Sequence, residues 1–267
     1  MMKKISVSLA SVVLLVSGCT QAGEPSAGED VDVNSRLAEV LGEKTLQACT
    51  TGDYRPYTYK DPDTGEWSGI DIDMANSLAE SLDADIEFVQ TSWGDLVPDF
   101  KDQCDIAVGG ISYTTDRAQQ VAFTDATAPD GKTPIVRCGE QEKYSDIDQI
   151  NRANVRVITP IGGTNERFAD KNFPDAEVIK FKDNNTIFDQ IIKGDADVMV
   201  TDASETRWVQ HEKPELCAVH PDEPFDHFDK GYLVPQGDTE WEEYVDNWLD
   251  IASQDGTKER AESKWFG

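Results

Sequence analysis

The chain has 267 residues, a formal net charge of −28 and a hydrophobic content of 38%. So acidic a surface repels nucleic acid and anionic lipid headgroups, which excludes both as expected partners. It also repels an anionic ligand at long range, so the cations that bind such a ligand must lie close to the site.

The N-terminus has the pattern of an export signal that ends in a lipid-attachment site. A basic start and a short apolar run lead to Val16-Ser-Gly-Cys19. This pattern predicts a lipoprotein signal peptide over 1–18, with Cys19 acylated as the first mature residue. A membrane-anchor helix is the alternative, but the apolar run is too short to cross a bilayer. We expect an exported protein, in the periplasm or on the outer face of the membrane, held by a lipid anchor and a flexible tether over 19–42.

About 225 residues follow the tether, enough for one large or two small lobes. In their first half we expect strands at 46–50, 86–89 and 105–110 and helices from Asp71 and over 96–100. Asp71 is placed to cap its helix, in which Met74, Leu78 and Leu82 share one face.

The second half shows the same alternation of strands and helices. We expect strands at 155–159 and 196–200 and helices over 164–172, 186–193 and 240–252. Strands that alternate with helices predict an α/β fold with mostly parallel sheets. Ligands of such sheets bind at the carboxyl ends of the strands.

Four cysteines follow Cys19, an even number that favours disulfides in an exported chain. Cys49 and Cys104 border predicted strands of the first half, whereas Cys138 and Cys217 both lie in the second half. We favour the pairs 49–104 and 138–217, although four cysteines allow three connectivities and four free thiols are the alternative. A metal site is not expected, because no CxxC motif occurs and the three histidines are scattered.

The turn before the helix at 164–172 has the composition of an anion site. Gly162 and Gly163 allow a tight turn with outward-facing amide groups at a helix start. Thr164 and Asn165 either donate to a ligand there or only cap the helix. Glu166 adds a carboxyl group that can act on the bound molecule.

Several ordered motifs resemble the polar amino-acid family of periplasmic solute-binding proteins. They are Gly69-Ile-Asp-Ile-Asp-Met-Ala75, Gly110-Ile-Ser112 with Arg117, and Gly194-Asp-Ala-Asp197 followed by Thr201-Asp202. Within it, the chain is similar to the cyclohexadienyl dehydratases, in stretches that include Cys49-Thr-Thr-Gly-Asp-Tyr54, Thr91-Ser-Trp93 and Gly162-Gly-Thr-Asn-Glu166. The resemblance spans nearly all of residues 46–267.

This resemblance implies a type II periplasmic-binding-protein-like fold with two α/β lobes, two hinge crossovers and a ligand cleft between the lobes. The first lobe would comprise 43–135 together with 226–267, and the second lobe 136–225. The crossovers are expected near 133–136 and 224–227.

The implied activity is loss of water and carbon dioxide from prephenate, giving phenylpyruvate, or from arogenate, giving phenylalanine. The protein would hold a dicarboxylate and protonate the departing hydroxyl, and we expect no cofactor. Glu166 is the candidate general acid, so its pKa must rise from about 4.3. Burial in a closed cleft and the substrate carboxylates would raise this pKa, whereas a helix start and nearby cations would lower it. We expect the raising effects to prevail only when substrate is bound and the lobes are closed.

The resemblance also assigns substrate-binding roles, each with a structural alternative. Arg117, after the turn that holds Ser112, would bind the side-chain carboxylate, or else form a surface ion pair. Lys132 would meet the second carboxylate, or else be a surface lysine near the hinge. Asp202 would pair with a substrate ammonium, which suits arogenate, or else cap the next helix.

Tyr54 and Trp93 would sandwich the substrate ring, with burial in the core as the alternative.

Two other functions remain open. One is a non-catalytic, lipid-anchored receptor that delivers an amino acid to an ABC permease, which the lipid-attachment site suits. The other is an extracellular ligand sensor, which is disfavoured because no signalling domain follows Gly267.

Overall fold

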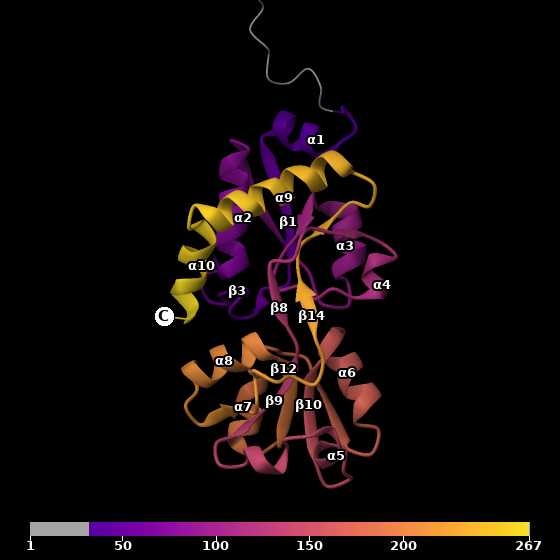
Figure 1. Cartoon of the computed structure of the whole chain (residues 1–267), viewed down its shortest axis with the longest axis vertical. Helices are drawn as coiled ribbons and strands as arrows, with labels where there is room; N and C mark the ends of the chain where they lie inside the picture. Colours follow the sequence, from indigo (N-terminus) through magenta and orange to yellow (C-terminus); the bar gives the residue numbers. More distant parts are fainter. Residues whose placement is uncertain (1–31, 267) are drawn as a thin grey trace, which may run out of the picture. The chain divides into compact units, whose positions relative to one another are not determined.

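The computed structural model describes residues 32–266. The predicted signal peptide, Cys19 and the first part of the predicted tether lie outside the described residues. The described chain forms two α/β lobes, each built around a five-stranded sheet (Figure 1). The predicted fold class is therefore confirmed.

The first sheet has the strand order β5-β1-β6-β15-β7. Its strands are β1 (Thr45–Thr50), β5 (Asp85–Gln90), β6 (Ile106–Ala107), β7 (Ala122–Phe123) and β15 (Leu233–Val234). β1 runs parallel to β5 and β6, whereas β15 is antiparallel to β6 and β7. β15 comes from the C-terminal part of the chain. The strands of the second sheet therefore lie, in sequence, between β7 and β15 of the first sheet.

Helices pack on both faces of the first sheet (Figure 1). They are α1 (Arg36–Glu43), α2 (Ile70–Ser81), α3 (Leu96–Gln103), α4 (Thr115–Ala118), α9 (Thr239–Gln254) and α10 (Thr257–Phe266). On one face, Leu78 of α2 and Trp241 of α9 are fully buried against strand residues such as Leu46. On the other face, Phe100 of α3 packs against β1.

The second sheet has the order β11-β10-β12-β9-β13. Its strands are β9 (Lys132–Arg137), β10 (Arg156–Pro160), β11 (Glu177–Phe181), β12 (Val198–Asp202) and β13 (Leu216–Ala218). The strands β10, β11 and β12 are parallel, and β9 is antiparallel to β12 and β13. The accompanying helices are η1 (Gln141–Lys143, 3-10), α5 (Ile147–Ile150), α6 (Thr164–Asn172), α7 (Ile187–Lys193) and α8 (Ala203–Glu212).

Two antiparallel strands, β8 (Ala128–Asp130) and β14 (Phe228–Lys230), run side by side where the chain passes between the sheets (Figure 1). The predicted crossover at 133–136 is wrong, because those residues belong to β9 inside the second sheet. Ile135 and Val136 are fully buried sheet residues. The lobe limits given above stay a prediction.

Two further local predictions need correction. Asp71 does not cap α2, which begins at Ile70; its buried carboxylate accepts hydrogen bonds from the amides of Gly109 and Gly110 at 3.0 and 2.6 Å. α1 lies within the predicted tether, since Ser35 caps it and its Val40 is buried in the core. α10 was not predicted from the sequence.

A small sheet of β2 (Asp53–Tyr54), β3 (Thr58–Lys60) and β4 (Trp67–Ser68) completes the first lobe.

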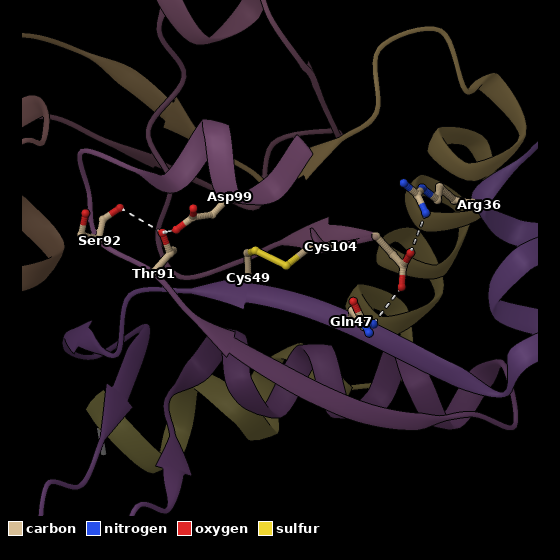
Figure 2. Close-up of a disulfide and its surroundings, with 8 residues drawn as sticks. Arg36, Gln47, Cys49, Thr91, Ser92, Asp99 and Cys104 are labelled. Carbon is tan, nitrogen blue, oxygen red and sulfur yellow. Dashed lines mark hydrogen bonds and ion pairs between the residues drawn. A yellow bond between two sulfur atoms is a disulfide. The ribbon is translucent and has the colours of Figure 1, made fainter. Parts of the chain in front are cut away.

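The structure contains two disulfides, Cys49–Cys104 and Cys138–Cys217, the pairs that the sequence favoured. Figure 2 shows the first of these, between the end of β1 and the residue that follows α3. Both of its cysteines are buried in the first lobe, whereas the second disulfide joins β9 to its edge partner β13.

Removing the first disulfide by Cys49→Ala with Cys104→Ala should lower the free energy of unfolding by about 4 kcal/mol. The reason is that the bond closes a loop across a sequence separation of 55 in the unfolded chain. Urea unfolding of the variant and the wild type measures this difference. An unchanged unfolding midpoint would contradict the expectation.

Within residues 32–266, no helix is both long and apolar enough to cross a membrane. In the same part of the chain, no group of three or more histidine, cysteine, aspartate or glutamate side chains is arranged to hold a metal ion.

Candidate active site

A cavity with about 310 Å³ of empty space, open in part to solvent, lies where the carboxyl ends of the two sheets meet. Its lining residues are Tyr54, Trp93, Gly110, Ser112, Pro160, Gly163, Thr164, Asn165, Asn184 and Asp202. They lie at or just beyond the carboxyl ends of the parallel strands β1, β5, β6, β10, β11 and β12. This is the place where α/β sheets bind ligands. Six of the eight predicted substrate-binding residues line this single cavity.

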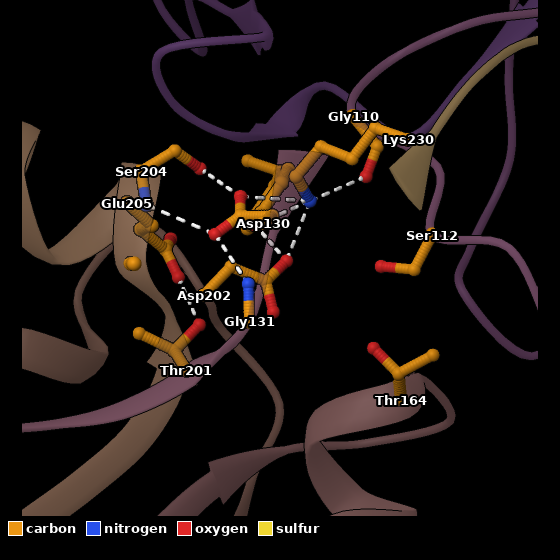
Figure 3. Close-up of polar contacts among 12 residues, drawn as sticks. Gly110, Ser112, Asp130, Gly131, Thr164, Thr201, Asp202, Ser204, Glu205 and Lys230 are labelled. Carbon is orange, nitrogen blue, oxygen red and sulfur yellow. Dashed lines mark hydrogen bonds and ion pairs between the residues drawn. The ribbon is translucent and has the colours of Figure 1, made fainter. Parts of the chain in front are cut away.

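Asp202, the last residue of β12, is the centre of a buried ionic cluster on the cavity wall (Figure 3). Its Oδ1 accepts a hydrogen bond from Lys132 Nζ. Its Oδ2 accepts from Lys230 Nζ at 2.6 Å and from the Tyr54 hydroxyl. Although Asp202 is the residue before α8, its side chain makes no capping hydrogen bond. The alternative role of Asp202 as a side-chain helix cap therefore has no support in the structure.

The two lysines of the cluster hold further groups in place. Lys132 Nζ donates to Thr164 Oγ1 at 2.9 Å and to Asn165 Oδ1, at the start of α6. Lys230 Nζ donates to the carbonyl oxygen of Gly110 at 3.1 Å and lies 3.5 Å from Asp130 Oδ2. Both lysine side chains are at most 2% exposed, so the surface role considered for Lys132 is ruled out.

Charge pairing controls the protonation of this cluster. Burial by itself would raise the pKa of Asp202, but the ammonium groups of Lys132 and Lys230 outweigh burial and lower it. Burial would lower the pKa of Lys230, but the carboxylates of Asp202 and Asp130 raise it instead. For Lys132, burial is the larger effect and lowers the pKa, with Asp202 opposing it. Asp202 is therefore a carboxylate at neutral pH, and Lys230 is a cation.

Glu205, three residues further along in the first turn of α8, is the opposite case. Its carboxyl group is 2% exposed, and burial raises its pKa to about 8, even though the Thr201 hydroxyl donates to Oε2 at 2.5 Å. The negative charge of Asp202 raises this pKa further. Thr201 Oγ1 in turn accepts from Asn165 Nδ2 at 2.8 Å, which connects Glu205 to the cavity wall. Glu205 is therefore an acid that stays protonated at neutral pH. It does not line the cavity itself and is connected to it through Thr201 and Asn165.

Glu166, the candidate acid from the sequence, is not among the residues that line the cavity. Its Oε1 forms an ion pair with Lys180 at 2.6 Å, and its Oε2 accepts from the amide of Gly162 at 2.5 Å. The hydrogen bond from Lys180, together with that from Gly162, lowers the pKa of Glu166. In this arrangement Glu166 is a carboxylate that holds the turn before α6, and its role as the general acid stays a prediction.

Arg117 lies directly behind Ser112, whose carbonyl oxygen accepts a hydrogen bond from Arg117 Nη1 at 2.8 Å. Its guanidinium carbon lies 6.0 Å from the centre of the Trp93 ring, and the side chain is buried. Burial lowers the pKa of Arg117 to about 10, so the group remains a cation at neutral pH. A surface ion pair, the alternative role, is therefore excluded. The ring of Trp93 meets that of Tyr54 edge to face, with centroids 5.5 Å apart.

Sequence reasoning missed Glu205, Lys230 and Asp130. Glu205 is the third residue of its helix, a position where glutamate is common for capping alone, so it carries no separate signal. Lys230 and Asp130 meet only because β14 pairs with β8, a contact between segments about 100 residues apart. The Thr201-Asp202 motif pointed to the right strand end, but not to the acid that follows it.

Comparisons with known proteins show the family of the chain. The model of the bacterial extracellular solute-binding proteins, family 3, matches residues 46–267. The chain is 43% identical to a cyclohexadienyl dehydratase of Pseudomonas aeruginosa, over 97% of this chain and 92% of that protein. It is 27% identical to a putative ABC transporter arginine-binding protein of Escherichia coli, over 84% of this chain and 91% of that protein.

Two solved structures of ancestral proteins resemble the chain. One is an ancestral amino acid-binding protein, a precursor of cyclohexadienyl dehydratase, with a TM-score of 0.80 and 32% identity; the match covers 87% of this chain and 100% of that one. The other is an ancestral cyclohexadienyl dehydratase, with a TM-score of 0.56 and 43% identity; the match covers 88% and 98%. The chain thus belongs to the bacterial extracellular solute-binding proteins, family 3, and is an exported protein that resembles the dehydratases of that family.

Proposed function

We propose that the chain is an exported cyclohexadienyl dehydratase whose general acid is Glu205. The chain is similar to a cyclohexadienyl dehydratase over nearly its whole length, and that reaction requires a proton donor at neutral pH. The observation that carries the assignment is a buried carboxyl group, with a pKa of about 8, behind a cavity whose lining residues are contacted by buried cations. An amino-acid receptor needs the cations and the cavity, but it has no use for a protonated acid.

Glu205 fits the role of the acid better than Glu166. The Thr201 hydroxyl donates to Oε2 of Glu205, so the proton of the neutral acid can be carried by Oε1. Oε1 of Glu166 forms an ion pair with Lys180, and Oε2 accepts a hydrogen bond from the amide of Gly162. Both interactions stabilise the ionised form of Glu166. An acid that must donate a proton needs the neutral form to be populated, and burial supplies that at Glu205.

The chemical step requires one proton. A carboxyl proton passes to the ring hydroxyl of prephenate as the bond from that ring carbon to oxygen breaks, so water leaves. The bond between the ring and its carboxylate breaks at the same time, and its electron pair enters the ring as carbon dioxide departs. The ring becomes aromatic and phenylpyruvate remains. Glu205 is left as a carboxylate and regains its proton from solvent.

The dicarboxylate is held by the cations that surround the cavity. Arg117 lies on one side of the cavity, where it donates to the carbonyl oxygen of Ser112. Lys132 and Lys230 lie on another side, where both donate to Asp202. Carboxylates at the two ends of the substrate would therefore be placed between separate cations, with the ring beside Trp93 and Tyr54. No residue in this scheme requires a cofactor.

Closure of the two lobes would complete the site. Tyr54 of β2 contacts Asp202 of β12, and Asn184 Nδ2 donates to the carbonyl oxygen of Asp53 at 2.8 Å. These contacts join residues of the first lobe to residues of the second lobe. Substrate would enter when the two lobes separate and be enclosed when they close.

Turnover tests the proposed function directly. Purified protein is mixed with prephenate at neutral pH, and phenylpyruvate is measured against a protein-free blank. We expect saturable formation of phenylpyruvate above the spontaneous rate. Saturable binding of an amino acid, with no turnover of prephenate or arogenate, would instead establish the receptor that serves an ABC permease.

The lipid anchor is a separate proposal that rests on Val16-Ser-Gly-Cys19. The variant Cys19→Ser should move the protein from the membrane fraction to the soluble exported fraction, because it removes the attachment point of the acyl chains. Immunoblots of the two fractions measure this. A wild-type protein already found in the soluble fraction would contradict the anchor and leave the enzymatic proposal untouched.

A further inference from the structure

A chain of hydrogen bonds through three side chains ends at the carboxyl group of Glu205. Lys132 Nζ donates to Asn165 Oδ1, and Asn165 Nδ2 donates to Thr201 Oγ1 at 2.8 Å. The Thr201 hydroxyl donates to Glu205 Oε2 at 2.5 Å, the last step of the chain, which Figure 3 shows. Thr201 is fully buried, and Asn165 and Glu205 are 7% and 2% exposed, so water does not compete for these bonds.

The direction of each bond in this chain is fixed by the one before it. The ammonium of Lys132, which is paired with Asp202, can only donate, so it holds Asn165 with Oδ1 toward it. The opposite orientation of the amide would place two donors against each other. Nδ2 of Asn165 therefore faces Thr201, and because it can only donate, the hydroxyl oxygen accepts. The single hydroxyl proton of Thr201 is left for Glu205.

This fixed direction decides where Glu205 carries its own proton. Because Oε2 accepts from Thr201, a carboxyl proton on Oε2 would face the hydroxyl proton, so the neutral acid is protonated on Oε1. After the proton has left, Thr201 still donates to the carboxylate and stabilises it. One hydroxyl thus selects the donating oxygen and also strengthens the acid.

We propose that Thr201 is a positioning residue for Glu205, which it holds by Oε2 so that Oε1 alone carries the transferable proton. This inference rests on the proposed function, since Glu205 is the acid of that same site. Thr201 is not among the residues that line the cavity, so its hydroxyl acts on the reaction through Glu205.

The charged surroundings of Glu205 do not depend on the Thr201 hydroxyl. The titratable groups that face Glu205 belong to the ionic cluster: Tyr54, Asp130, Lys132, Asp202 and Lys230. Burial has the largest influence on the pKa of Glu205 and raises it, and the hydrogen bond from Thr201 comes next and lowers it. A substitution of Thr201 leaves the cluster in place, so a change in the pKa of Glu205 reports the loss of the hydroxyl.

Titration of Glu205 by NMR tests this proposal without any substrate. The protein carries glutamate labelled with carbon-13 at the side-chain carboxyl group, and Glu205→Gln identifies the signal of Glu205. Thr201→Val removes the hydroxyl at nearly constant volume, and the pKa of Glu205 should rise above the wild-type value because its ionised form loses a hydrogen bond. Thr201→Ser keeps a hydroxyl and should restore the wild-type titration.

Thr124→Val is the matched control. Thr124 is 2% exposed and lies just after β7 in the first lobe. Its hydroxyl also accepts one hydrogen bond and donates another, from the amide of Tyr232 at 3.0 Å and to the carbonyl oxygen of Asp125 at 3.1 Å. The same chemical change is therefore made at a buried threonine whose hydroxyl does not contact Glu205, and the titration of Glu205 should not move.

The pH profile of phenylpyruvate formation gives a second readout. In Thr201→Val, kcat at neutral pH should fall by about tenfold or more with little change in KM, because the acid is weaker and no longer held. The decline of kcat/KM on the alkaline side should begin at a higher pH than in the wild type. Thr201→Ser should recover both kcat and the wild-type profile.

The two readouts separate this inference from the proposed function. An unchanged pKa of Glu205 in Thr201→Val, or a Thr201→Ser variant that titrates like Thr201→Val, would overturn the inference while the dehydratase remains. A wild type without turnover would refute the proposed function, and the titration alone would then decide whether Thr201 holds Glu205. If circular dichroism shows that Thr201→Val is unfolded, Thr201→Ala, which also lacks the hydroxyl and is smaller, takes its place with the same expectations.

Discussion

Replacing Glu205 by glutamine is expected to lower kcat/KM for prephenate by about 10²–10⁴-fold, the usual contribution of a general acid. Glutamine keeps the size of the side chain and can still accept from Thr201, as Glu205 Oε2 does at 2.5 Å. It has no acidic proton to transfer. Steady-state rates of phenylpyruvate formation measure the loss, and circular dichroism confirms that the variant is folded.

Glu166→Gln is the matched comparison, because it makes the same chemical change at the acid that the sequence suggested. Its ion pair with Lys180 lies outside the cavity, so we expect kcat/KM to change by less than about tenfold, through the loosened turn at Gly162. A large loss in Glu166→Gln, with little loss in Glu205→Gln, would return the role to Glu166 and contradict our assignment.

The second large effect is expected on stability. Asp202→Asn should lower the free energy of unfolding by about 3–5 kcal/mol, because it leaves the buried Lys132 and Lys230 without their shared counter-charge. Because the pKa of Asp202 is lowered in the folded state, its stabilising contribution is present at neutral pH and is lost on acidification. The difference between variant and wild type should therefore shrink as the pH is lowered below the ordinary range of aspartate. Urea unfolding at neutral and acidic pH measures both statements.

Asp83→Asn is the control for this experiment. Asp83 pairs with Lys44 at 3.2 Å on the surface, and its side chain is 96% exposed. Its backbone has φ of 50°, a conformation that asparagine also adopts readily. We therefore expect almost no change in stability. If Asp83→Asn and Asp202→Asn destabilise the protein equally, the buried cluster is not the source of the effect.

The local pattern of the sequence predicted the strands and helices that frame the site. Val155 to Thr159 and the two glycines after them gave β10, the turn and α6 almost to the residue. Such elements follow from short-range rules: β-branched runs form buried strands, and glycines allow the turn that follows. The resemblance to the solute-binding proteins assigned Tyr54, Ser112 and Asp202 to the ligand site, and the glycine turn pointed to Thr164. All four residues line a single cavity at the strand ends.

Those short-range rules could not predict the chemical roles of the residues around the cavity. Lys230 reaches Asp202 only because two crossover strands pair, and Glu205 is an acid only because it is buried. Burial and the partners of a side chain are tertiary properties, and a pKa depends on both. The glycine turn made Glu166 the candidate acid in the sequence. In the structure Lys180 on β11, fourteen residues away in the sequence, forms an ion pair with its carboxylate.

The pH dependence of phenylpyruvate formation tests the central claim most directly. The protein is assayed with prephenate from neutral to alkaline pH, with the spontaneous reaction subtracted at each pH. Since the active form of Glu205 is protonated, kcat/KM should be highest below a pH of about 8 and fall about tenfold per pH unit above it. Glu205→Gln should lose this dependence along with most of the rate. No phenylpyruvate above the blank, or a rate that rises with pH, would contradict a dehydratase that depends on a buried protonated carboxyl group.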